Sequence, residues 1–129
     1  MSRPDVPAAW VRRIAAVLEA LPECERVEAW VGVQWQVASK SVAHAFGGED
    51  GLVRITFRAE PDEVMAFQHL GAPYFRAGYG RDVVGLVLDD GTDWDELAEL
   101  LTDAYCLRAP ERLATLVPRP PSPGSGGPP

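Results

Sequence analysis

Five basic residues are the side chains best suited to bind a charged ligand. They come from two predicted hairpins, the polar side of a strand and an aromatic loop: Lys40, Arg54, Arg58, Arg76 and Arg81. Lysine and arginine hold phosphate groups by charge and by hydrogen bonds, so a patch of them would suit a nucleic-acid backbone. Acidic residues that could pair with them include Glu49, Glu60, Asp62 and Asp82, among others. Surface ion pairs with these acids are the alternative use of the arginines, and the pattern leaves both uses open.

Four aromatic residues are candidates for contact with a ligand or a protein partner: Trp35, Tyr74, Phe75 and Tyr79. An aromatic ring can stack on an unpaired base when it is exposed, and it fills an apolar core when it is buried. The sequence leaves these two uses open as well.

Histidines and cysteines show no pattern typical of a catalytic or metal site. Neither His44 nor His69 has a serine, cysteine or carboxylate at the spacing of a catalytic group or metal ligand. Cys24 and Cys106 are isolated from each other and from both histidines, which favours two reduced thiols. We therefore expect a protein without enzymatic activity, bound metal or cofactor.

The composition indicates one acidic domain. The chain has 129 residues, of which 47% are hydrophobic, and this is enough for one core. The net charge of −7 opposes strong binding to a phosphate backbone, although a local basic patch can act against it. The sequence shows neither the apolar run of a signal peptide nor an apolar run of about 20 residues. We expect a cytoplasmic protein without membrane contact, with one domain over residues 1–117 and a mobile tail over residues 118–129.

Helical and alternating patterns predict the elements that position these side chains. Residues 5–21 and 61–70 have helical spacing, with Pro61 at the start and Gly71 after the end of the second helix. Three runs alternate as strands, at residues 31–37, 42–46 and 52–59, and a further strand is expected at 82–89. Residues 72–81 are expected to form a short strand or an exposed loop.

The strongest helical pattern covers residues 93–117. Thr92 or Asp93 can cap its start, and Pro110 divides it into two helices. Trp94 begins the apolar side, so we predict that it anchors this helix against the sheet and that its replacement by alanine costs about 3–5 kcal/mol. The whole pattern predicts an α+β fold, in which an antiparallel sheet of about five strands packs on helices in two layers. The expected order is helix, three strands, helix, two strands, two helices.

Three segments then point to a family. They are WQVASKSVAHAF at residues 35–46, PYFRAGYGRDVVGLVLD at residues 73–89, and DWDELAELLTDAY at residues 93–105, followed by A-P-x-x-L. Each is weak alone, but in this order and spacing they resemble the MmcQ/YjbR family of small bacterial proteins, over about residues 6–117.

The resemblance implies the same α+β fold, which is related to secretion-chaperone-like domains. Family members are commonly labelled DNA-binding because their hairpins suggest a double-wing motif, so the resemblance implies DNA as a partner of the basic set. This sequence departs from that expectation because it is acidic and because its loop at residues 76–81 has two arginines but no lysine or histidine. The alternative is a chaperone-like module that binds a protein or small ligand and forms a homodimer.

Overall fold

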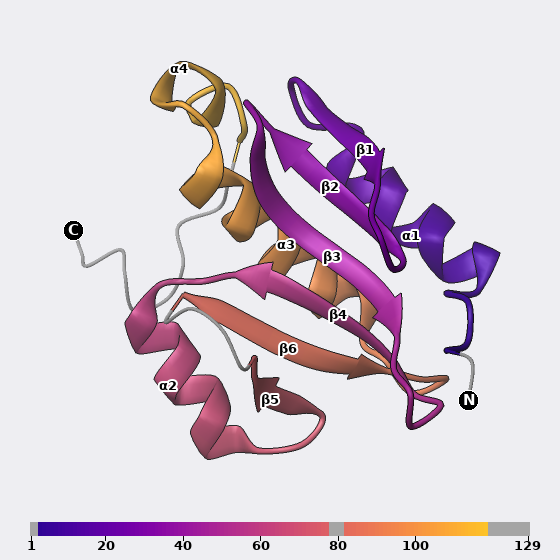
Figure 1. Cartoon of the computed structure of the whole chain (residues 1–129). Coiled ribbons are helices and arrows are strands. Elements are labelled where there is room, and N and C mark those ends of the chain that lie inside the picture. The colour runs from indigo at the N-terminus through magenta and orange to yellow at the C-terminus, as the bar shows by residue number, and fades with distance from the viewer. Residues whose placement is uncertain (1–2, 78–81, 119–129) are drawn as a thin grey trace.

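Alternating side chains build a sheet with one apolar and one polar face. The structure is a computed structural model that describes residues 3–77 and 82–118. The described elements, in chain order, are α1 (Ala8–Leu18), β1 (Cys24–Glu28), β2 (Val33–Val37), β3 (Lys40–Gly47), β4 (Val53–Arg58), α2 (Pro61–Leu70), β5 (Tyr74–Arg76), β6 (Val83–Leu88), α3 (Trp94–Arg108) and α4 (Glu111–Ala114). The predicted α+β fold is confirmed (Figure 1).

The strands form one antiparallel sheet in the order β1-β2-β3-β4-β6-β5. About five strands were expected, and the described residues form six. The additional strand is β1, whose sequence looks like an acidic turn because charged residues occupy most of it. This is physically reasonable for a strand at the edge of a sheet, where charged side chains keep access to water and discourage further strand pairing.

The helices cover one face of the sheet. Helix α3 packs against β3 and β4, α1 packs against α3, and α2 packs against β5 and β6 (Figure 1). The apolar positions of the central strands point into this layer, where they meet the buried residues of α1 and α3. The core includes the strand residues Trp35, Val37, Ala45, Ile55 and Phe57 and the helix residues Ile14, Leu18, Leu97, Leu101 and Tyr105. Among the described elements, no helix packs on the other face, which we call the open face.

The predicted ends of α2 and the predicted start of α3 are confirmed by their capping geometry, whereas α1 is shorter than the predicted 5–21 and has no side-chain cap. Helix α2 begins with a reciprocal capping box between Glu60 and Glu63 and ends at Gly71, whose φ of 73° suits glycine. The side chain of Asp93, rather than that of Thr92, caps α3 by accepting a hydrogen bond from the backbone N–H of Glu96. Sequence patterns of this kind locate helix ends well because the caps are local.

The structure corrects the prediction for Trp94. This residue is half-buried, and its ring lies 6.3 Å from that of Trp10 and 5.3 Å from the guanidinium of Arg13, both in α1. Trp94 therefore joins two helices instead of fixing α3 to the sheet. The sheet contact is made one turn later, beginning with the buried Leu97.

Candidate functional site

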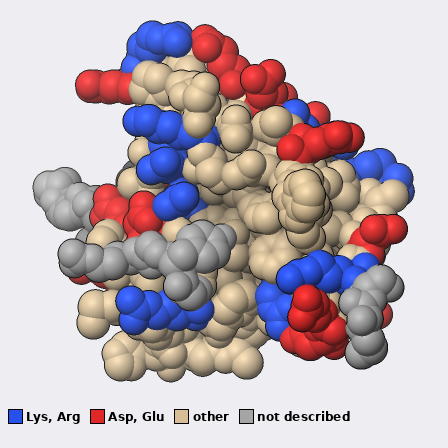
Figure 2. Space-filling model, in the orientation of Figure 1, with Lys and Arg blue, Asp and Glu red and all other residues tan. Residues whose placement is uncertain are grey.

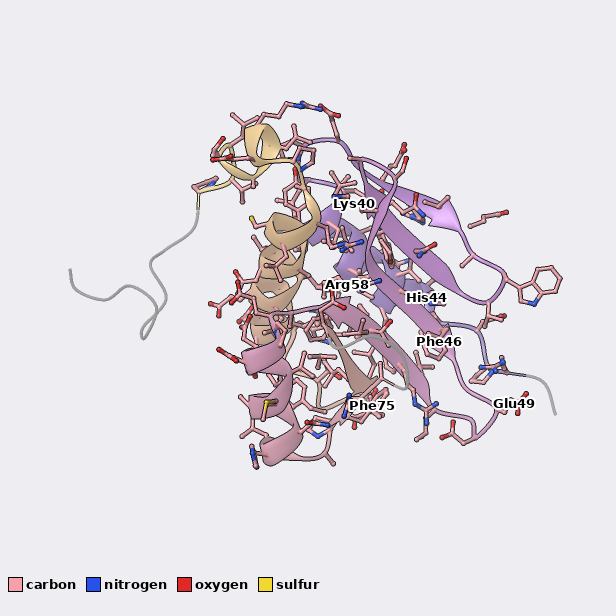
Figure 3. All side chains as sticks on the ribbon, turned by 60° about the vertical axis from the view of Figure 1, so that its left-hand side comes forward. Lys40, His44, Phe46, Glu49, Arg58 and Phe75 are labelled. Atoms are coloured by element: carbon pink, nitrogen blue, oxygen red, sulfur yellow. The ribbon has the colours of Figure 1, made fainter. Side chains whose placement is uncertain are left out.

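Polar and aromatic side chains occupy the open face. Strand alternation and register place these residues there: Gln34, Gln36, Ser41, His44, Phe46, Arg54, Thr56, Arg58 and Phe75. Figure 3 shows Lys40, His44 and Phe46 along β3, Arg58 on the neighbouring β4, and Phe75 on the edge strand β5. The open face therefore collects several of the residues that the sequence analysis singled out.

Two of the predicted basic residues, Arg54 and Arg58, lie together on this face. They are four positions apart on β4, which corresponds to about 13 Å along a strand. Arg54 makes a two-pronged ion pair with Asp50, and Arg58 donates from Nη1 to Oδ1 of Asp82 at 3.0 Å. The hydrogen bond from Arg54 lowers the pKa of the Asp50 carboxyl to about 2. Both arginines are thus ion-paired, Arg58 with Asp82, which the sequence analysis named, and Arg54 with Asp50, which it did not name.

Phe75 lies flat against the sheet beside Arg54. Phe75 pairs with Gly85 of β6. A Cβ atom on Gly85 would lie only 2.2 Å from the Phe75 ring, so the ring occupies space that a larger residue than glycine would fill. The guanidinium of Arg54 lies 5.8 Å from the ring centre, within cation–π range. Phe75 and Arg54 therefore form a partly exposed pair at one end of the open face.

His44 and Phe46 form a second aromatic pair on β3. Their ring centres are 4.9 Å apart, as expected for alternate residues on one side of a strand. Nε2 of His44 is hydrogen-bonded to the carbonyl oxygen of Val31, which fixes the imidazole against the β1–β2 loop. If Nε2 donates to this carbonyl, Nδ1 is left as an acceptor in the neutral ring.

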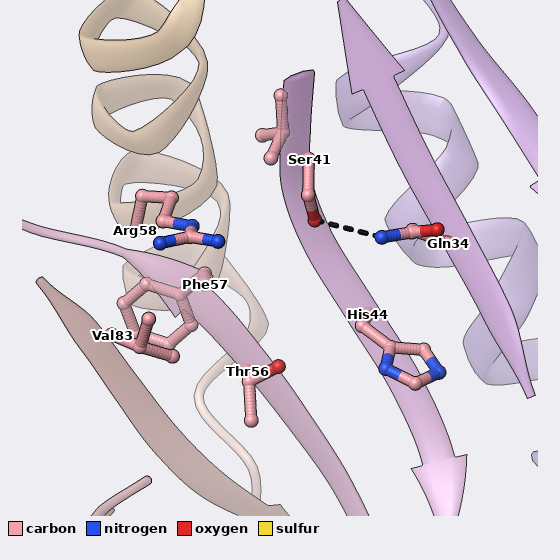
Figure 4. A pocket seen from close by; sticks show the side chains of 8 residues that line it. Gln34, Ser41, His44, Thr56, Phe57, Arg58 and Val83 are labelled. Carbon is pink, nitrogen blue, oxygen red and sulfur yellow. Dashed lines mark hydrogen bonds between the residues drawn. The ribbon is translucent and has the colours of Figure 1, made fainter. Parts of the chain in front are cut away.

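A shallow pocket of about 110 Å³ opens between β3 and β4 (Figure 4). It is lined by Gln34, Ser41, Val42, His44, Thr56, Phe57, Arg58 and Val83. Most of its polar lining comes from the alternate residues of three neighbouring strands. The pocket therefore offers hydrogen-bonding groups in the middle of the open face.

Tyr74 and Arg76, two other predicted site residues, do not join this surface. They alternate with Phe75 on β5, so they point to the helical side of the sheet. The Tyr74 ring packs on Phe67 of α2, and its hydroxyl donates to the carboxylate of Glu96 at 2.8 Å. Burial is the larger cause, and this hydrogen bond the next, of a raised pKa for the Tyr74 hydroxyl. Tyr74 therefore ties β5 to α3, and Arg76 is separated from Arg54 and Arg58 by the sheet.

Trp35 is a core residue and not a contact residue. Its side chain has 0% exposed surface and faces the helical layer, and its indole N–H donates to Glu19, the C-cap residue of α1, at 2.9 Å. A side chain without exposed surface cannot touch a partner, so its inclusion in the site is wrong. The hydrogen bond from Arg26 is the main cause that lowers the pKa of the Glu19 carboxyl. Burial acts in the opposite direction, and the hydrogen bond from Trp35 lowers this pKa further.

Lys40 is exposed at the start of β3, just after a turn through Ala38 and Ser39, which both have positive φ. Within residues 3–77 and 82–118 it makes no ion pair. Tyr79 and Arg81 lie outside the described residues, as does nearly all of the predicted tail.

The sequence analysis missed several residues of this surface. Gln34, Ser41 and Thr56 line the pocket, and their signal was the polar half of each alternating strand. Trp30, in the β1–β2 loop, is fully exposed and also escaped notice. Trp30 stands just before the alternating run at residues 31–37 and two residues before Gly32, and a bulky aromatic residue at such a strand boundary is the signal that could have found it.

Charge is unevenly distributed over the open face. Figure 2 views this face and shows Lys and Arg side chains along its left side and lower part. Acidic side chains lie along the upper and right margins and also beside the basic ones at the left and lower right. The basic groups of this view are therefore interspersed with acidic ones, two of which pair with Arg54 and Arg58.

In the described part of the chain, no group of three or more His, Cys, Asp or Glu side chains could hold a metal ion. Within the same residues, no helix is both long enough and apolar enough to cross a membrane.

Comparison with known proteins identifies the family. No curated protein matches the sequence. Among solved structures, the chain is similar to the crystal structure of the Deinococcus radiodurans protein DR2400, which has a DUF419 domain of the same family. The two are 19% identical, with a TM-score of 0.65, over 91% of this chain and 94% of the other, so the likeness shows the shared fold. The model of the YjbR family matches residues 19–107, most of the chain, and this protein therefore belongs to the YjbR family.

Proposed function

We propose that this protein is a non-enzymatic domain that binds single-stranded nucleic acid on the open face of its sheet. The observation that carries the proposal is the combination, on one uncovered face, of two ion-paired arginines, the ring of Phe75 beside one of them, the aromatic pair of His44 and Phe46, and a polar pocket. Arginines on such a face suit phosphates, and exposed aromatic rings suit unstacked bases.

Single strands fit this surface better than a duplex. The bases of a duplex are stacked on one another, so the rings of Phe46 and Phe75 cannot stack on them, whereas unpaired bases are free to do so. Duplex binding would also depend more heavily on phosphate contacts, which an acidic protein supplies poorly.

The environments of the nucleophilic groups support a non-enzymatic role. Burial, followed by the charges of Glu19 and Glu25, raises the pKa of the Cys24 thiol to about 11, so it is protonated at neutral pH and unreactive. The Ser41 hydroxyl oxygen accepts a hydrogen bond from Gln34 at 3.0 Å, an amide that cannot act as a general base.

A titration of labelled single-stranded and duplex DNA over a range of salt concentrations tests the proposal. Replacing both Arg54 and Arg58 by alanine is expected to weaken single-strand binding about tenfold or more at low salt. The slope of log K against log salt should become shallower by about 0.7 for each phosphate that the variant no longer neutralises.

The matched control replaces Arg26 and Arg112 by alanine. These arginines are also ion-paired with carboxylates, at 2.8 Å and 3.1 Å, but they bind Glu19 and Glu23 away from the open face. The control makes the same change in net charge and should bind nearly as well as the parent protein. Equal weakening in both double variants, or no binding by the parent at tens of micromolar protein, would refute the proposal.

Binding of a protein partner is a second candidate, which the β1–β2 hairpin favours. Trp30 is fully exposed there, and tryptophan is a frequent anchor of protein interfaces. The neighbouring β1 is an edge strand, whose unpaired backbone groups can accept another strand. If a homodimer forms through this hairpin, light scattering should give twice the monomer mass for the parent and the monomer mass for Trp30→Ala. A monomeric parent at all concentrations argues against this candidate.

A further inference from the structure

The pocket on the open face exists because β3 and β4 separate at this point. The pairing of β3 with β4 runs from Gly47 back to Ala43, which is opposite Phe57. The first three residues of β3, at positions 40–42, are not paired with β4. Val42 is an extra residue in β3, since Trp35 pairs with Ala43 and the next residue of β2 pairs with Ser41. Such a bulge bends a strand and changes the direction of its side chains.

The free part of β3 is held from the helical side. Nε of Arg108, at the end of α3, donates to the carbonyl oxygen of Ser41 at 3.2 Å. This bond supports β3 where β4 no longer pairs with it. The pocket is therefore a built feature of the sheet, supported by α3 and positioned at the separation of the two strands.

The polar groups of the pocket are supplied by both of its walls. Gln34, Ser41 and His44 lie on the β2–β3 side, and Thr56 and Arg58 lie on the β4 side (Figure 4). Gln34 donates to the Ser41 oxygen, which leaves the hydroxyl proton of Ser41 to be donated elsewhere. The Arg58 guanidinium, held by Asp82, carries positive charge into the same pocket.

The size of the pocket restricts what it can hold. Its volume is about 110 Å³. Pockets for drug-sized ligands measure about 300–1,000 Å³, whereas an engineered cavity of about 150 Å³ binds benzene. The pocket is smaller than that cavity, so it has room for part of a single planar ring, the rest lying outside its mouth, and no room for a fused double ring.

We propose that this pocket receives one pyrimidine base of the bound single strand. This proposal rests on the proposed function, and it specifies which class of base binds in the pocket at the centre of the open face. A pyrimidine is a single ring with a carbonyl oxygen on its hydrogen-bonding edge, which Arg58 and the Ser41 hydroxyl can donate to. Val42, Phe57 and Val83 are the apolar residues that line the pocket, and the adjacent pair of His44 and Phe46 offers a stacking surface for a neighbouring base.

Competition between oligo-dT, oligo-dC and oligo-dA of equal length, measured by fluorescence anisotropy, tests this inference. The parent protein should prefer both pyrimidine oligomers over oligo-dA by about fivefold or more, the lower range for one well-made base contact. The variant Arg58→Gln should lose this preference, and Ser41→Ala should reduce it.

The control is Arg54→Gln, which changes the same residue type on the same strand and face. Arg54 is also ion-paired with an aspartate but does not line the pocket. Its loss should weaken binding to all three oligomers equally and leave the pyrimidine preference intact. This comparison separates base reading from phosphate contact, because both variants lose one positive charge.

The possible outcomes distinguish the pyrimidine site from the proposed function. Equal binding of all three oligomers by the parent overturns the pyrimidine site and leaves the proposed function standing. A pyrimidine preference that survives in both Arg58→Gln and Ser41→Ala also overturns it, since the preference then arises outside the pocket. No binding to any oligomer by the parent overturns the proposed function and the pyrimidine site together.

Discussion

Replacing Trp35 by alanine is expected to lower the free energy of unfolding by about 3–5 kcal/mol. The side chain is completely buried on β2, where it fills the space between the sheet and α1. Its removal leaves a large cavity and also frees the Glu19 carboxylate from the indole N–H. This is a large share of the roughly 5–15 kcal/mol by which domains of this size are stable.

Trp94→Ala is the matched comparison, because it removes the same side chain from a half-buried position. Its expected cost is about 1–2 kcal/mol, since only part of the ring surface is withdrawn from water and the ring packs mainly on Trp10 and Arg13. Denaturant melts of the two variants and the parent provide the values. If Trp94→Ala is the more damaging change, the packing described for α1 and α3 is wrong.

The second large effect is expected for Gly32→Ala, at about 2–5 kcal/mol. Gly32 has a φ of 75°, which is costly for alanine, and a Cβ there would lie 2.0 Å from the carbonyl oxygen of Ala45. Because this neighbour is backbone of the central strand β3, the β1–β2 loop must move away from Phe46 to relieve the overlap. Urea unfolding curves measure the loss of stability.

Gly51→Ala separates strain from overlap. Gly51 has a similar φ of 86°, but nothing lies within 4 Å of the position of its Cβ. This variant should lose only about 1 kcal/mol, the lower end of the cost of a positive φ. Equal losses in Gly32→Ala and Gly51→Ala would mean that the close approach between the loop and β3 is absent.

Local signals predicted most of the fold. The alternation in β4 correctly assigned Val53, Ile55 and Phe57 to the apolar side, and Pro61 and Gly71 correctly marked the ends of α2. These signals work because one residue and its near neighbours decide the backbone geometry. Strand β1 escaped prediction because an exposed edge strand has little need of apolar residues, so its hydrophobic pattern is weak.

Residues of the site were harder to predict because tertiary structure decides which face they occupy. Phe75 and Arg76 are neighbours in sequence, yet strand alternation places them on opposite sides of the sheet. Trp35 and Phe46 both lie in alternating strands, and only the position of the helices shows that one is core and the other open surface. The pocket depends on a bulge at Val42, which the sequence pattern does not reveal.

Backbone amide chemical shifts, followed during titration with a short single-stranded oligonucleotide, test the central claim most directly. The proposal predicts that the largest changes occur in β3 and β4, around His44, Thr56 and Arg58, and extend to Phe75 on β5. Residues of α1 and the exposed side of α3 should change little, because the sheet separates them from the open face. Changes concentrated on the helices, or no changes at saturating oligonucleotide, would contradict binding on the open face.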